Sequence, residues 1–193
     1  MENAMTQGYP SRTRIHPHKF ALWVACAGIV MMFTALTSAY IVRKAAGNWL
    51  EFELPNIFYW NTLVILTSSL TLHSAYLAFQ RGWAKAYASL LGATLLLGLV
   101  FLGLQYEGWQ AMVEQGIPLK TNPSGDFIYV ISGIHGAHVL GGLAALAVSF
   151  GLALLRPFRQ TPVRKLRLEL VLTYWHFVDF LWLYLLIFWV IQG

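Results

Sequence analysis

Several ionisable side chains, His73 among them, stand inside long apolar runs of this sequence. Four are the main candidates for chemistry there: His135, His138, His176 and Asp179. Groups of this kind are costly at membrane depth, and they are usually functional or paired. Two histidines on different helices could ligate a haem, as in membrane cytochromes of the b type. An acid near a histidine could form a polar clasp between helices or relay protons. We predict structural polar contacts for these four residues, with no catalytic, metal-binding or cofactor-binding role.

The depth of Asp179 in its apolar run indicates which partners it could have. At ~1.5 Å of rise per residue, Asp179 lies near the bilayer midplane, where an unpaired carboxylate would cost ~2.5–3.5 kcal/mol. His176 shares a helical face with Asp179, and His138 lies within one turn of the same depth. We therefore predict that His176, His138 or both hold Asp179. Replacing Asp179 by Leu is then expected to loosen the bundle.

Composition predicts a protein that lies mostly within a membrane. Of the 193 residues, 58% are hydrophobic and 11% are charged, whereas about 25% are charged in soluble domains. Five apolar runs are each long enough to span a bilayer, which takes ~20 residues. They cover about Phe20 to Val42, Ile57 to Phe79, Ala84 to Tyr106, Phe127 to Leu155, and Leu168 to Ile191. We predict an all-α membrane protein with a polar cytoplasmic tail over 1–19 and one five-helix transmembrane bundle over 20–193.

The placement of basic residues predicts the orientation of this bundle. All but three of the 13 Lys and Arg residues fall in the tail and in the second and fourth connections. The exceptions are Arg43, Lys44 and Lys120. By the positive-inside rule, the N-terminus is cytoplasmic and the C-terminus lies outside. The basic pI near 9.5 therefore reflects topology, and we predict no nucleic-acid partner.

The run from Phe127 to Leu155 has two different faces. Small residues lie on one face, where another helix could approach closely; they are Gly133, Ala137, Gly141, Ala144 and Gly151. Polar residues follow the opposite face with His135 and His138. We predict that this helix is enclosed on both sides, by its own chain or by a partner. The arginines between Arg156 and Arg167 are expected to contact that partner or lipid phosphates.

Two further segments carry polar residues. Ser and Thr are frequent between Asn61 and Tyr76, and we interpret them as hydrogen-bonding groups that pack helices together. The segment from Glu107 to Asp126 is rich in Gly and Pro and is predicted to be the only long outer loop.

Four motifs, in this order, resemble subunit III of the haem–copper respiratory oxidases. They are LPNIFYWNTLVILTSSLTLHSA from Leu54, GLVFLGLQYEGW from Gly98, GIHGAHVLGG from Gly133 and YWHFVDFLWLYLLIF from Tyr174. The chain is similar to the five-helix bacterial form, and His135, His138, His176 and Asp179 occupy the family's motif positions. One departure is Ile29, where the family pattern would put a carboxylate.

The resemblance implies a subunit without redox centres in a bacterial cytoplasmic membrane. Haems and copper would lie in partner subunits, and the partners would include oxidase subunits I and II. The family packs against catalytic subunit I, binds phospholipid and supports proton uptake. The whole complex would reduce O₂ with electrons from cytochrome c or quinol. The alternative is a haem-binding membrane electron carrier of the cytochrome b type, which a visible redox spectrum of the isolated polypeptide would reveal.

Overall fold

The structure, a computed structural model, describes residues 16–192. Within them the chain forms five helices: α1 (Pro17–Ala45), α2 (Ile57–Gln80), α3 (Ala84–Glu114), α4 (Pro123–Leu155) and α5 (Pro162–Gln192). Each is long and apolar enough to cross a membrane. The predicted all-α, five-span fold is confirmed, while the sides on which the termini lie stay a prediction. Residues 1–15 of the predicted tail lie outside the described residues.

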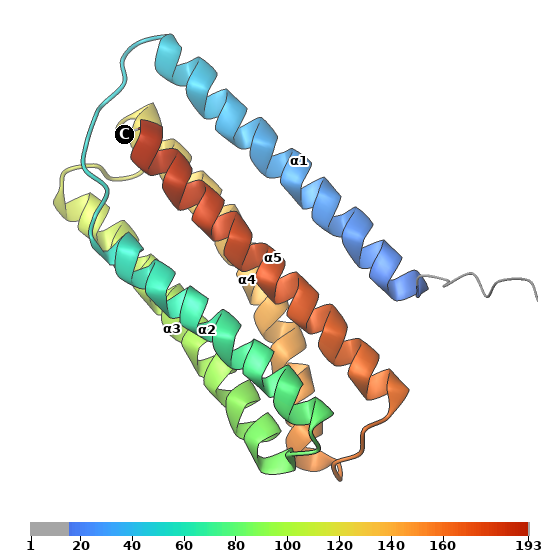
Figure 1. Cartoon of the computed structure of the whole chain (residues 1–193). Coiled ribbons are helices and arrows are strands. Elements are labelled where there is room, and N and C mark those ends of the chain that lie inside the picture. Colours follow the sequence, from blue (N-terminus) through green and yellow to red (C-terminus); the bar gives the residue numbers. More distant parts are fainter. Residues whose placement is uncertain (1–15, 193) are drawn as a thin grey trace, which may run out of the picture.

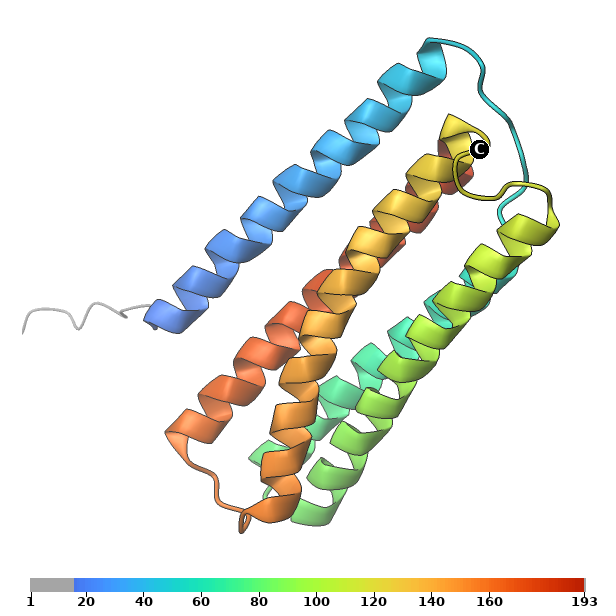
Figure 2. The ribbon, with the colours of Figure 1, turned by 180° about the vertical axis from the view of Figure 1, so that it is seen from behind.

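The helices form three groups across the bundle. α4 and α5 lie in the middle, α2 and α3 lie together on one side, and α1 lies on the other side (Figures 1 and 2). α1 packs on α4 and α5, and among the described residues it makes no such packing with α2 or α3. Therefore α4 and α5 are the two helices through which the whole bundle is connected.

The helices are longer than the apolar runs predict, most clearly at the end where α3 meets α4. The expected loop from Glu107 to Asp126 is wrong, because α3 continues to Glu114 and α4 begins at Pro123. Gly116, two residues after the end of α3, has a φ of +79°, a left-handed conformation that suits glycine. The side chain of Asn122 accepts a hydrogen bond from the Ser124 N–H at 3.0 Å and caps α4. Helical hydrogen bonds thus continue into polar sequence that hydropathy alone excludes.

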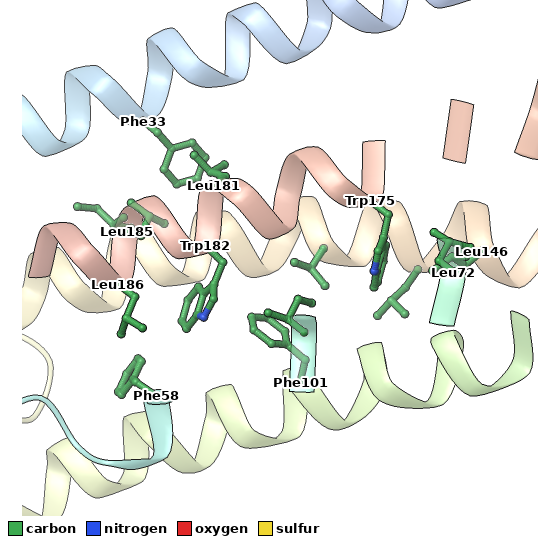
Figure 3. Close-up of a cluster of buried hydrophobic side chains, with 14 of the residues drawn as sticks. Phe33, Phe58, Leu72, Phe101, Leu146, Trp175, Leu181, Trp182, Leu185 and Leu186 are labelled. Atoms are coloured by element: carbon green, nitrogen blue, oxygen red, sulfur yellow. The ribbon is translucent and has the colours of Figure 1, made fainter. Parts of the chain in front are cut away.

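The centre of the core is built around two tryptophans of α5 (Figure 3). The indole N–H of Trp175 donates to Ser68 Oγ at 3.0 Å, and that of Trp182 donates to Thr62 Oγ1 at 2.9 Å. Both acceptors belong to α2. The interpretation of the Ser and Thr residues of this helix as packing groups is therefore confirmed: hydroxyls of α2 satisfy donors that would otherwise be buried unpaired.

Close helix approach occurs on the histidine side of α4. A Cβ at Gly142 would lie 2.9 Å from the ring of Trp175. On the opposite face, Ala137, Gly141 and Ala144 are exposed on this chain. The prediction that α4 is enclosed is thus met by the chain itself on one side only, because its own helices pack against the face that carries the histidines.

We expect Gly98→Ala in α3 to lower the free energy of unfolding by about 1–3 kcal/mol, because it overfills a packed core. The added Cβ would lie 2.6 Å from Leu143 Cδ2 and 2.9 Å from Trp175 Cη2. Gly103→Ala is the matched control in the same helix, since nothing lies within 4 Å of its Cβ. Unfolding in mixed micelles measures both, and equal stability of the two variants would contradict close packing at Gly98.

Candidate functional site

His135 lies at the centre of an aromatic cluster. Its ring is 0% exposed, and its centroid is 5.1 Å from that of Trp182, 5.9 Å from Phe101 and 6.4 Å from Phe33. Neither ring nitrogen has a hydrogen-bond partner among the described residues. The side chain therefore packs as an aromatic ring, in contact with residues of α1, α3 and α5.

The ring of His138 makes a hydrogen bond within its own helix. Its Nδ1–H donates to the carbonyl of Ile134, with 2.8 Å between the two atoms, because a carbonyl can only accept. The backbone carbonyl of His138 accepts in turn from the Tyr174 hydroxyl at 3.0 Å. His138 thus helps join α4 to α5, through its backbone and not through its ring.

His176 lies in the seam between α2 and α5. Its Nδ1 shares a hydrogen bond with the Ser69 hydroxyl of α2. The ring of His73, also from α2, lies 5.9 Å from the His176 ring, centroid to centroid. His176 and His138 are therefore both engaged with groups other than Asp179.

Asp179 is 3% exposed, and its carboxylate oxygens have no hydrogen-bond partner among the described residues. The prediction of a hydrogen bond from His176 or His138 to Asp179 is wrong in this respect. The Nδ1 atom of His176 is bonded to Ser69 and that of His138 to the Ile134 carbonyl, and neither ring makes a hydrogen bond to Asp179. The structure thus leaves a polar side chain in the apolar core without the predicted clasp.

A polar cluster that the sequence did not predict joins α1, α2 and α5 at the end of the bundle where α1 begins. Glu169 Oε2 is 2.7 Å from Lys19 Nζ, and Glu169 Oε1 accepts from the Tyr76 hydroxyl at 3.0 Å. Lys165 Nζ lies 3.8 Å from the same carboxylate. Part of the signal was available, because Lys19 stands near the start of α1 and Glu169 in the second turn of α5, and both helices begin at the same end (Figure 1).

A pocket of about 460 Å³ lies beside this end of the bundle. Four arginines line it: Arg156, Arg159, Arg164 and Arg167, together with Tyr87 from the start of α3. None of the four has a carboxylate within 4 Å among the described residues. Arg164 donates to the carbonyls of Leu152 and Pro157, both at 3.3 Å. The pocket is therefore a basic site that suits an anion.

No three His, Cys, Asp or Glu side chains within residues 16–192 gather as a metal site. His135, His138, His176 and Asp179 do not converge on one point, so the structure gives them separate surroundings. That the chain itself holds no haem or metal stays a prediction.

The motif-bearing helices α2 to α5 match known proteins along their whole length. A family model described as cytochrome c oxidase subunit III matches residues 48–193. The chain belongs to this family. The match contains His135, His138, His176 and Asp179, and it begins after α1.

Curated relatives of the subunit III family extend the match across α1. The probable cytochrome c oxidase subunit 3 of Nocardia farcinica is 28% identical over 94% of this chain and 91% of its own length. The cytochrome c oxidase subunit 3 of Corynebacterium diphtheriae is 31% identical, over 82% and 80%. The quinol oxidase subunit 3 of Bacillus subtilis is 29% identical, over 84% and 81%.

The structure reverses the expected effect of replacing Asp179. We expect Asp179→Leu to raise the free energy of unfolding by about 1 kcal/mol, because it removes a buried polar group that lacks a partner. Glu169→Leu in the same helix is the matched control and should lower stability by about 1 kcal/mol, since it removes three polar contacts. Unfolding of both variants in mixed micelles tests this. A loss of stability in Asp179→Leu would mean that the carboxyl group has a stabilising partner.

Proposed function

We propose that this chain is the non-catalytic subunit III of a proton-pumping haem–copper terminal oxidase. The observation that carries the proposal is the family match over α2–α5, which form one packed unit together with α1. In this role the chain stabilises catalytic subunit I, binds phospholipid and supports proton uptake. The redox chemistry belongs to haems and copper in the partner subunits.

The environment of each motif residue supports a structural role for it. His135 is enclosed by aromatic rings, and the rings of His138 and His176 are engaged with Ile134 and Ser69. The ring contacts of His135 and His176 join helices, and the four motif residues lie in separate surroundings. They therefore favour a scaffold over a haem-binding electron carrier.

The exposed face of α4 supports association with oxidase subunits I and II. Ala137, Gly141 and Ala144 are exposed on this chain and give acyl chains little dispersion contact. Small residues allow a helix of another subunit to approach closely. We therefore place the contact with catalytic subunit I on this face.

The proposed setting is a bacterial cytoplasmic membrane, with the N-terminus in the cytoplasm. The basic pocket then lies at the cytoplasmic surface, which agrees with the positive-inside rule. Relatives named as cytochrome c oxidase and as quinol oxidase subunits both match. The proposal accordingly includes either cytochrome c or quinol as the electron donor of the complex.

We expect the tagged chain, purified in mild detergent, to retain a large multi-helix subunit whose reduced spectrum shows haem. After that subunit is removed, the isolated polypeptide should show no haem absorption. A chain that always runs alone would contradict the role of subunit III. A haem spectrum in the isolated polypeptide would instead support the electron-carrier alternative.

We also expect the basic pocket to retain an acidic phospholipid at the cytoplasmic surface. Arg156→Gln with Arg159→Gln should reduce the phosphatidylglycerol that remains bound after detergent extraction, measured by mass spectrometry. Arg164 is left intact because it caps the end of α4. Arg81→Gln with Lys85→Gln is the control, with the same change of charge at the same end. Equal loss of lipid from both double variants would contradict a specific site.

A further inference from the structure

A second pocket, of about 300 Å³, lies at the opposite end of the bundle from the basic one. It is formed by the connection between α1 and α2 and by the ends of α1, α2 and α5. The connection is held in place by the α4 cap: Asn122 Oδ1 accepts from the Leu50 N–H at 3.3 Å, and Asn122 Nδ2 donates to the Asn48 carbonyl at 3.4 Å. The pocket therefore has a defined wall, although much of that wall is not helical.

Aromatic side chains make up much of the lining. Tyr40, Trp49, Tyr59 and Trp189 all line the pocket. The rings of Tyr40 and Trp49 meet edge to face, with centroids 4.6 Å apart and planes at 76°. Ring faces attract cations, tryptophan most strongly, and such groups of rings bind organic ammonium ions.

Two carboxylates line the same pocket. Glu51 and Glu53 are two residues apart in the connection between α1 and α2, which is neither helix nor strand, and both are exposed. Neither has a Lys, Arg or His nitrogen within 4.0 Å among the described residues, where both ion pairs belong to Glu169. The pocket thus combines two negative charges with aromatic rings and has no cationic side chain in its lining.

The wall also contains a buried hydrogen-bond donor. Trp189 is 2% exposed, and its indole N–H has no acceptor among the described residues. No described residue satisfies this donor, so a ligand oxygen that reached the ring would gain a hydrogen bond. A ligand that carries both a cationic group and a nearby oxygen atom therefore matches the pocket better than a simple amine does.

We propose that this pocket binds the ammonium group of an aminoalcohol phospholipid headgroup, with ethanolamine as the reference case. The ammonium group lies against the ring of Trp49, which the buried Tyr40 supports from behind, and Glu51 and Glu53 balance its charge. The position at the end of the membrane spans favours a lipid, because apolar side chains such as Leu50 and Val190 are exposed at the rim. Glycerol and acyl groups can lie against them.

The inference deepens the proposed phospholipid binding by naming a headgroup class and a second site. It does not depend on oxidase membership, because the side chains of this pocket all belong to this chain. The two lipid sites are also distinguishable by charge: the basic pocket suits an anionic headgroup, while this pocket suits a cationic group.

The test uses the full chain in mild detergent, with any subunits that accompany it, labelled with fluorotryptophan. Short-chain phosphatidylethanolamine is titrated while the ¹⁹F resonance of Trp49, assigned with Trp49→Phe, is followed. We expect a saturable shift, and an affinity reduced about tenfold by Glu51→Gln with Glu53→Gln. The control, Glu107→Gln with Glu114→Gln, removes two exposed acids of α3 that do not line the pocket and should leave the affinity unchanged.

Three further titrations separate the sources of the ligand. Short-chain phosphatidylglycerol has no ammonium group and should not shift the Trp49 resonance; an equal shift overturns the proposal. Free ethanolamine should bind at least tenfold more weakly than the lipid, and equal affinity would replace the lipid with a small amine. Oligolysine that displaces the lipid at lower concentration would mean that a protein segment occupies the pocket. The proposal also falls if the Glu51 and Glu53 double variant keeps full affinity.

Discussion

Two indole N–H groups donating to two hydroxyls hold the centre of this bundle. Helices in lipid gain little from apolar contact with one another, so packing and polar contacts must hold them together. Trp175 and Trp182 supply both, because their N–H groups bind Ser68 and Thr62 of α2 while their rings fill the core. The ring of Trp175 rests against Gly98 of α3 and Gly142 of α4. One face of α5 thus sets the distances from α5 to α2, α3 and α4.

The fold was predictable because the bilayer sets a length that every spanning helix must meet. The packing hydroxyls of α2 were predictable for a related reason, since buried donors in an apolar medium need acceptors. The rotation of α4 about its own axis was harder to predict. Periodicity separated the Gly141 face from the Gly142 face, but it could not decide which one meets the same chain. That choice depends on Trp175, which lies on another helix.

The surroundings of Asp179 show a different limit of sequence reasoning. Matched depth made His138 a reasonable partner, yet depth says nothing about which acceptor a ring will find first. Nδ1 of His138 bonds the carbonyl four residues earlier, and Nδ1 of His176 bonds a serine across the seam. The cluster around Glu169 was missed for a similar reason: its partners Lys19 and Tyr76 come from α1 and α2, and only tertiary packing brings them together.

The attachment of α1 has a consequence for how the chain assembles. Thr37 bonds Tyr184 across 147 residues of sequence, and α1 does not pack against its neighbour α2. The contacts of α1 within this chain can therefore form only after α4 and α5 have been made. Its span from Phe20 to Val42 contains no charged residue, so this delay exposes no ion to the acyl chains. A carboxylate at position 29 would lack a partner within the chain during that interval and would cost free energy among acyl chains. Ile29 carries no such cost.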